Sequence, residues 1–348
     1  MGQRPQNNIG KTRMTRLPKT MRAIEIKNPG GPEVMKVTQA PLPKLADGEV
    51  LIAVDTAGVN RPDIMQRTGM YPPPPGASPI PGLEVSGTIV TSNSKTEHFN
   101  VGDKVCALVS GGGYAEYAKA PFSQCLPIPK NVTIKEAGSL PETYFTVWTN
   151  VFNRANLSPG ESILIHGGSS GIGTTAIQIC NALGHRVFAT VGSEKKRQPC
   201  MDLGARHVIN YNSEQFENEI LNLTDNRGVD VILDMVGGSY LQRNLNCLAD
   251  DGRLSIIAFL GGIKANLDMT DILKRRLTIT GSTLRPRSSE FKGKIAASLL
   301  EHVWPLFDKK LINPVVCDSF TLEEVSAAHS LMESSDHVGK IVLEVGCG

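Results

Sequence analysis

Paired cysteines are what this sequence most clearly lacks. Its seven cysteines are scattered without a CxxC pair, at positions 106, 125, 180, 200, 247, 317 and 347. Such spacing provides neither a disulfide framework nor a zinc knuckle. It is typical of a reduced, intracellular protein, and we expect a cytoplasmic location.

Strong charge and long apolar runs are missing as well. The formal net charge is only +2, which gives no reason to expect nucleic acid as a partner. No apolar run approaches the ~20 residues that span a bilayer, so we expect no membrane partner. With 348 residues, 40% hydrophobic and 20% charged, the chain is long enough for two soluble domains.

Acidic residues are absent from the first 22 positions, which contain six Lys or Arg residues. An Arg-rich, acid-poor start is one mark of an organelle targeting peptide. Pro5 and Pro18 interrupt the segment, however, and it has no convincing amphipathic face. We therefore expect a disordered tail over residues 1–20, or a start codon upstream of Met14 or Met21. A targeting peptide is the alternative.

What the chain does contain is a glycine-rich turn between two apolar segments, in residues 161–180 (ESILIHGGSSGIGTTAIQIC). Ser162–Ile165 is long enough for one buried strand, and residues 174–182 carry apolar residues at helical spacing. Strand, glycine turn and helix open a dinucleotide-binding βαβ unit. Glycines let backbone N–H groups approach a pyrophosphate, which the helix N-terminus also favours.

The segments after this turn argue against an ordinary strand-to-helix turn. Strands are predicted at 186–191, 207–210, 229–234 and 252–257, and helices at 194–203 and 214–223. This alternation is typical of an α/β fold with a parallel, doubly wound sheet.

The residues before the turn have a different pattern. Short β-type segments with Pro- and Gly-rich turns begin at Met21 and predict a mostly antiparallel β domain. A predicted helix at 139–155 leads into the glycine turn. Helices at 295–306 and 322–332 and a strand at 340–345 end the chain. We predict a doubly wound domain at 144–284, inserted in a β domain made of 21–143 and 285–348.

Four segments resemble the medium-chain dehydrogenase/reductase superfamily. They are residues 57–90, the glycine turn, residues 233–262 and residues 337–345 (HVGKIVLEV). The match is closest to the zinc-independent quinone oxidoreductases, the zeta-crystallin-like group, and within it to the p53-inducible quinone oxidoreductase branch. It covers nearly everything from Met21 to Val345. The resemblance implies a Rossmann nucleotide domain inserted in a GroES-like domain.

Zinc ligands of that superfamily are missing here. Its zinc alcohol dehydrogenases have a Cys ligand early in the chain and a Gly-His-Glu motif later. Here the first position falls in Val59-Asn60-Arg61, which has no thiol, and the second reads Gly82-Leu83-Glu84, with Leu in place of His. A zinc ion needs three or four N, S or O ligands. We therefore predict no metal site.

The string GGSSGIG also resembles short-chain dehydrogenases. Those enzymes need a Tyr-x-x-x-Lys pair downstream of the turn, and no tyrosine of this sequence has a lysine four residues later. The 160 residues ahead of the turn fit that family badly as well, so the medium-chain interpretation is preferred.

The cofactor prediction depends on the end of the second strand of the βαβ unit. NAD-binding units usually place Asp or Glu there, whereas this strand ends in Thr190-Val191-Gly192-Ser193. Ser193, Lys196 and Tyr211 can bind a 2′-phosphate, which favours cations and hydroxyl donors. In the quinone oxidoreductases a Lys and a Tyr at the positions of Lys196 and Tyr211 hold this phosphate. We predict NADPH rather than NADH. The alternative for residues 195–197 is a solvated helix face.

The resemblance also implies the other cofactor contacts. Ser169, Ser170, Gly171 and Ile172 would contact the pyrophosphate, and Val236 would border the adenosine and ribose. Phe259 and Leu260 would pass beside the nicotinamide ribose. Thr146 would reach the carboxamide, and Leu284 and Arg285 would line the nicotinamide side.

Without zinc, hydrogen-bond donors must stabilise the oxyanion that forms when a hydride reaches the acceptor. Asn60, Asp63 and Tyr71 are the catalytic candidates, because their loop matches the family's substrate side of the cleft. The structural alternative is that Asn60 and Asp63 cap the helix predicted at 63–68, and that Tyr71 packs on the prolines that follow it.

Together with these residues, the resemblance implies NADPH-dependent reduction of quinones. The nearest alternative is reduction of an activated C=C bond in an enal, enone or enoyl thioester, with Tyr71 as the available proton donor. A protein that binds NADPH with little turnover is the alternative from another class. Apolar β-rich segments at 254–259 and 277–281 predict an edge strand that must be covered. We expect a homodimer, with a tetramer as the alternative.

Overall fold

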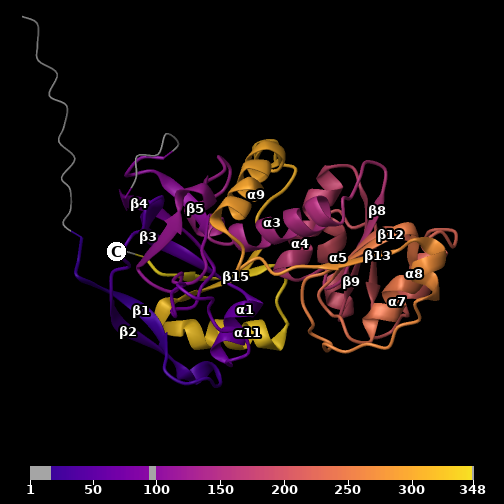
Figure 1. Cartoon of the computed structure of the whole chain (residues 1–348), viewed down its shortest axis with the longest axis horizontal. Helices are drawn as coiled ribbons and strands as arrows, with labels where there is room; N and C mark the ends of the chain where they lie inside the picture. The colour runs from indigo at the N-terminus through magenta and orange to yellow at the C-terminus, as the bar shows by residue number, and fades with distance from the viewer. Residues whose placement is uncertain (1–16, 94–98, 347–348) are drawn as a thin grey trace, which may run out of the picture.

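The computed structural model describes residues 17–93 and 99–346, which form two lobes (Figure 1). One lobe is built on a parallel six-stranded sheet of order β10-β9-β8-β11-β12-β13, the doubly wound order of a Rossmann fold. Its strands are β8 (Ser162–Ile165), β9 (Arg186–Val191), β10 (His207–Asn210), β11 (Val229–Asp234), β12 (Leu248–Ile256) and β13 (Thr278–Gly281).

Helices cover both faces of this sheet (Figure 1). They are α4 (Gly171–Ala182), α5 (Arg197–Asp202), α6 (Phe216–Leu223), α7 (Tyr240–Asn246) and α8 (Thr270–Arg275), with a 3-10 turn at Glu194–Lys196. Every residue of β8 and β11 is buried, as expected for central strands of a parallel sheet. The strands predicted from β8 to β11 are confirmed, whereas β12 begins four residues earlier than predicted.

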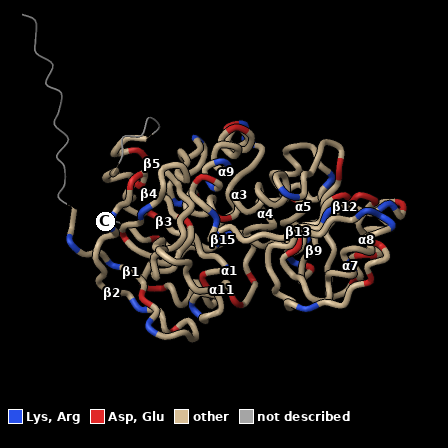
Figure 2. Tube along the Cα trace, viewed as in Figure 1, with Lys and Arg blue, Asp and Glu red and all other residues tan. Residues whose placement is uncertain are grey.

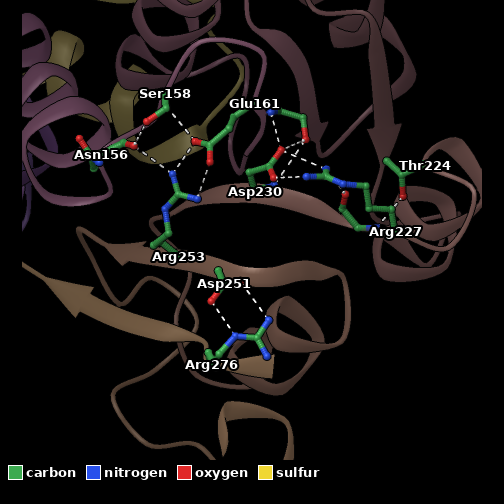
Figure 3. Close-up of polar contacts among 11 residues, drawn as sticks. Asn156, Ser158, Glu161, Thr224, Arg227, Asp230, Asp251, Arg253 and Arg276 are labelled. Atoms are coloured by element: carbon green, nitrogen blue, oxygen red, sulfur yellow. Dashed lines mark hydrogen bonds and ion pairs between the residues drawn. The ribbon is translucent and has the colours of Figure 1, made fainter. Parts of the chain in front are cut away.

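Ion pairs hold the amino ends of these strands (Figure 3). Arg253 of β12 donates to both carboxylate oxygens of Glu161, from Nη1 at 2.9 Å and Nη2 at 2.5 Å. Asp230 of β11 accepts from the Ser162 N–H and hydroxyl, both at 2.8 Å. These contacts lie away from the carboxyl ends of the strands, where ligands of such folds bind.

The other lobe is built on a seven-stranded sheet of order β14-β15-β3-β4-β5-β7, in which β6 also pairs with β3. Only β14 and β15 pair in parallel. Its strands are β3 (Glu49–Val59), β4 (Glu84–Ser92), β5 (Lys104–Leu108), β6 (Tyr117–Pro121), β7 (Cys125–Pro127), β14 (Val316–Thr321) and β15 (Lys340–Glu344), and β1 (Thr20–Ile26) pairs separately with β2 (Met35–Pro41). The end of the chain completes the antiparallel sheet, as predicted.

The helices of this lobe follow the prediction only in part. They are α1 (Arg61–Arg67), α2 (Ile134–Ala137), α3 (Pro141–Val147), α9 (Ser289–His302), α10 (Trp304–Asp308) and α11 (Val325–Ser334), with 3-10 turns at Pro32–Val34, Phe122–Gln124 and Leu322–Glu324. The predicted helix at 139–155 is α3 followed by a π-helix, Trp148–Arg154. The helix predicted at 295–306 is wrong as one element: it begins at Ser289 and breaks at Val303, because Pro305 suits only the first turn of a new helix.

Other predictions meet the structure only in part. Residues 1–16 of the predicted disordered tail lie outside the described residues, and Thr20 already belongs to β1. The division into domains at 143/144 and 284/285 stays our proposal.

Figure 2 shows basic and acidic residues interspersed over both lobes. Within the described ranges, the six cysteines are all free, and no helix is long and apolar enough to cross a membrane.

The two sheets are joined where the glycine turn meets the start of β15. Ser170 and Gly339 form an isolated parallel bridge, and the Gly339 N–H donates to the Ser169 carbonyl at 2.8 Å. The next side chain, Lys340, crosses Gly171: a Cβ built on Gly171 would lie 2.4 Å from Cδ of Lys340. A glycine is therefore needed at 171 for close approach of the two lobes.

Lys340 ends in a buried ion pair with Glu84 of β4. The Nζ–Oε1 distance is 2.7 Å, and the two side chains are 5% and 0% exposed. Nζ also donates to the Val59 carbonyl at 3.1 Å and to Oδ1 of Asn60. The ammonium thus has three partners, which offset the cost of burying its charge.

We expect Lys340→Met to lower the free energy of unfolding by about 3–5 kcal/mol, because the Glu84 carboxylate would stay buried without its counter-charge. Urea denaturation followed by circular dichroism measures this loss. The matched control is Lys135→Met, which breaks the exposed pair of Lys135 with Glu344 and should cost about 1 kcal/mol or less. Equal losses in the two variants would contradict the assignment.

Candidate functional site

The glycine turn has the geometry of a phosphate cradle. Ser170 caps α4 by accepting the Gly173 N–H at 3.0 Å. Gly167 has a φ of +65°, and a Cβ on Gly173 would lie 2.3 Å from the Gly167 carbonyl oxygen. Side chains are excluded here, so backbone N–H groups at the start of α4 can approach an anion. Ser169 is buried, and Ile172 is partly exposed at the first turn of α4.

Ser193, Lys196 and Tyr211 gather at the carboxyl end of β9. The Ser193 hydroxyl is buried with no hydrogen-bond partner among the described residues. The Tyr211 hydroxyl packs on Gly192, 2.4 Å from where a Cβ would stand. Lys196 is buried and its Nζ donates to the Ser335 carbonyl, while burial lowers its pKa. An unpaired hydroxyl beside a cation and a phenol fits a phosphate.

The acidic residue next to Ser193 in the sequence turns away from this position. Glu194 follows Ser193, but its side chain is exposed and accepts from Nε of Arg197 at 2.8 Å. It belongs to the first turn of a helix, as the sequence indicated.

The other predicted cofactor residues lie along the carboxyl ends of β11, β12 and β13. Val236 follows β11, where Asp234 accepts the N–H groups of Val236 (2.7 Å) and Gly237. Phe259 and Leu260 follow β12, and both are 56% exposed. The Leu260 N–H donates to the Met235 carbonyl at 3.1 Å, which joins the two loops.

The predicted nicotinamide end lies between the lobes. Thr146 is a partly exposed residue of α3, whereas Leu284 and Arg285 are buried after β13. The Arg285 Nε donates to the Ser110 carbonyl at 2.9 Å and its Nη2 to Gln66 at 2.8 Å. Nη1 has no partner among the described residues, and burial lowers the Arg285 pKa.

On the substrate side, the Asn60 amide is held between two charges. Oδ1 accepts from Lys340, and Nδ2 donates to Glu84 at 2.9 Å and to the Gly58 carbonyl at 3.4 Å. The side chain is 6% exposed. The amide therefore has one fixed orientation, in which its long bond to Gly58 is the weakest.

Asp63 is fully buried and its carboxylate is occupied. It accepts the N–H groups of Asn60 (2.9 Å) and Gly82 (3.0 Å) and the hydroxyl of Tyr114 (3.1 Å). Burial raises its pKa to about 6, although these donors favour the charged form. This geometry matches the capping alternative, because Asp63 at the third position of α1 completes half of a capping box.

Tyr71 lies over the Arg285 guanidinium, with 5.5 Å between the guanidinium carbon and the ring centre. It is partly exposed, and burial raises its pKa. Beside Arg285 opens a cavity of about 510 Å³, walled in part by the proline loop 74–78 and by Lys292 of α9. Arg285 lines this cavity, and Tyr71 lies against Arg285.

Sequence reasoning missed four charged residues of this region. Glu84 and Lys340 lay inside the quoted motifs, but their 2.7 Å pair joins strands far apart in the sequence. Glu142 carried no signal beyond a helical segment, and Lys292 lay outside the helix predicted at 295–306. Among the described residues there is no group of three or more His, Cys, Asp and Glu side chains that could hold a metal ion. The zinc positions offer only Asn60 and the buried Leu83, which do not fit zinc.

Two family models match this chain: "Alcohol dehydrogenase GroES-like domain" over residues 46–130 and "Zinc-binding dehydrogenase" over residues 171–300. Quinone oxidoreductase of Rattus norvegicus is 31% identical, over 93% of this chain and 98% of its own. The structure is similar to that of mycobacterial Rv1454c complexed with NADPH (27% identity, TM-score 0.82, covering 93% of this chain and all of the other). It is also similar to JamJ enoyl reductase (26% identity, TM-score 0.82, 94% and 99%). The chain belongs to the quinone oxidoreductase-like family of the medium-chain dehydrogenase/reductase superfamily.

Proposed function

We propose that this medium-chain oxidoreductase reduces quinones with NADPH and without a metal ion. The observation that carries the proposal is the position of Asn60. Its amide is fixed by Lys340, the residue that also crosses the glycine turn at Gly171. One ammonium thus joins the cofactor side of the cleft to the substrate side. The kinship with quinone oxidoreductases supports the acceptor class.

Bound NADPH supplies a hydride from its reduced nicotinamide ring. The protein's part is to orient the acceptor and to stabilise its developing oxyanion with hydrogen bonds. The Tyr71 hydroxyl has no hydrogen-bond partner among the described residues and lies beside the Arg285 cation. Asn60 Nδ2 can exchange its 3.4 Å bond to Gly58 for one to the acceptor. Asp63 keeps this loop in place and is a positioning residue.

NADPH is favoured over NADH by the site at the end of β9. Ser193 offers an unpaired hydroxyl, Lys196 a cation, and Glu194 points away. The likeness to a structure complexed with NADPH gives further support. Val236, Phe259, Leu260, Thr146 and the glycine turn complete the proposed cofactor site.

Reduction of an activated C=C bond is the second candidate function. The likeness to JamJ enoyl reductase favours it, and Tyr71 is then the proton donor. A protein that binds NADPH with little turnover stays the alternative of another class, and the cytoplasmic location stays a prediction.

We also infer a homodimer, from the free edge of the six-stranded sheet. Among the strands that the structure describes, β13 has a partner on one side only. Apolar side chains are exposed around it, with Ile279 on β13 at 37%, Leu273 on α8 at 83% and Ile263 at 79%. A second copy can pair along this edge and cover them.

The cofactor site predicts that Lys196→Met raises the KM for NADPH about tenfold or more and leaves that for NADH unchanged. A hydrogen bond to a charged group contributes about 1.5–3 kcal/mol. Initial rates with both cofactors measure this. The control is Lys195→Met, which removes an exposed charge paired with Asp336. An equal change in the KM for NADPH and the KM for NADH would contradict the 2′-phosphate assignment.

The acceptor assignment predicts NADPH oxidation with a panel of quinones, unaffected by a chelator. Tyr71→Phe should lower kcat about 100-fold by removing one oxyanion donor. Tyr144→Phe is the matched control, since its buried hydroxyl has no partner among the described residues. Turnover with enals alone would transfer the enzyme to the C=C reductases. Loss of activity with chelator would overturn the metal-free mechanism, and binding without turnover would favour a non-enzymatic role.

The edge of the sheet predicts a dimer by light scattering and a monomer for Ile279→Lys, because a charge at β13 prevents pairing along the strand. Lys309→Met, on an exposed turn of the other lobe, serves as the control. A monomeric native protein would contradict the proposed interface.

A further inference from the structure

The proposed hydride transfer leaves one requirement open, a source of the proton that the reduced acceptor takes up. We propose that Glu142 is this source: a catalytic acid that donates its carboxyl proton to the acceptor oxyanion. This assignment rests on the proposed function and adds a residue and a step to it.

The burial pattern of α3 directs Glu142 toward the cleft. Of the seven residues of this helix, only Glu142 and Thr146 are half-buried, and the other five are fully buried. They are four residues apart and therefore lie on one face, a single turn from each other. Thr146 is the residue proposed at the nicotinamide carboxamide. Glu142 thus stands one helical turn from the residue proposed at the nicotinamide.

The backbone of Glu142 is tied to the same network that orients Asn60. Its N–H donates to Oε2 of Glu84 at 2.8 Å, while Oε1 of Glu84 binds Lys340 and Asn60. The start of α3 is therefore fixed relative to the substrate loop. The Glu142 carboxyl group itself has no hydrogen bond or ion pair within the described ranges, so it is free to donate to a ligand.

Charged groups reach Glu142 from every neighbouring element. Glu84 on β4 and Asp63 on α1 oppose its ionisation, whereas Lys340 on β15 and Lys292 on α9 favour it. Tyr71 and Arg285 are close enough for electrostatic coupling on the acceptor side. Burial is the largest effect, and with Glu84 it raises the pKa of Glu142 to about 8. A carboxyl with this pKa holds its proton at neutral pH and can release it.

The step balances as follows. A hydride, with its electron pair, is added to the quinone, which is reduced to a phenolate while NADPH is oxidised. The O–H bond of Glu142 then breaks and a new O–H bond forms on the phenolate oxygen. Glu142 is left as a carboxylate beside Lys292, and water from the cleft returns the proton before the next turnover.

Glu142→Gln is the direct test, because it keeps the size of the side chain and removes the acidic proton. Protonated Glu142 is the active form, so native kcat should fall as pH rises through about 8. In the variant this decrease of kcat with pH should be absent. Its kcat at neutral pH should be about 100-fold or more below the native value. If Glu142→Gln had the same kcat and the same pH dependence of kcat as the native protein, the proposal would be overturned. A native enzyme inactive with every acceptor would overturn both the function and this role.

Lys292 needs separate treatment, since burial lowers its pKa to about 8 as well. Removing its positive charge makes ionisation of Glu142 harder. If Glu142 is the group that titrates, the decrease of kcat should therefore move to higher pH in Lys292→Met. If the decrease disappears in this variant, it belongs to Lys292 and the proposal is overturned.

Infrared difference spectra of the protein without cofactor give an independent readout. A carboxylic-acid band that titrates near pH 8 in the native protein should be missing from Glu142→Gln, and its persistence there would contradict the assignment.

Discussion

The buried pair of Lys340 and Glu84 is the interaction on which the rest of this structure depends. Its 2.7 Å contact joins the last strand of the chain to β4, and each partner makes further bonds that orient a part of the site. Lys340 lies against Gly171 of the glycine turn and binds the Asn60 amide. Glu84 binds the same amide and the first turn of α3. A buried ion pair is weak evidence for stability in itself, but this one fixes a lysine whose stem lies against the glycine turn of the other lobe.

That arrangement explains how the proposed metal-free mechanism is physically reasonable. A metal orients the substrate and stabilises its developing charge in one step. Without it, donors must be held in position by the protein before the reaction begins. The Asn60 amide has a single orientation because an ammonium and a carboxylate hold its two ends. Arg285 has its place fixed by Ser110 and Gln66, and Tyr71 lies over it.

The sequence predicted the parts of the molecule that depend on local pattern. The strands of the six-stranded sheet from β8 to β11 follow from short apolar runs between glycines and polar turns, and Ser170–Gly173 from the glycine spacing. The break at Val303 was missed because helical periodicity continues across Pro305. The π-helix after α3 was missed for a similar reason, since its residues have ordinary helical spacing. Boundaries set by backbone hydrogen bonding leave little trace in side-chain pattern.

The site was predicted only as far as its residues lie in motifs. Glu142 shows the limit. In the sequence it is an acidic residue in the first turn of a helix, which usually complements the helix dipole in solvent. Its environment comes from residues more than fifty positions away: Glu84 and Asp63 before it, Lys292 and Lys340 after it. These four charges converge only when the last strand of the chain closes the first sheet against the inserted domain. The chemistry of the cleft is therefore a property of the topology, because no single segment carries the charges that determine it.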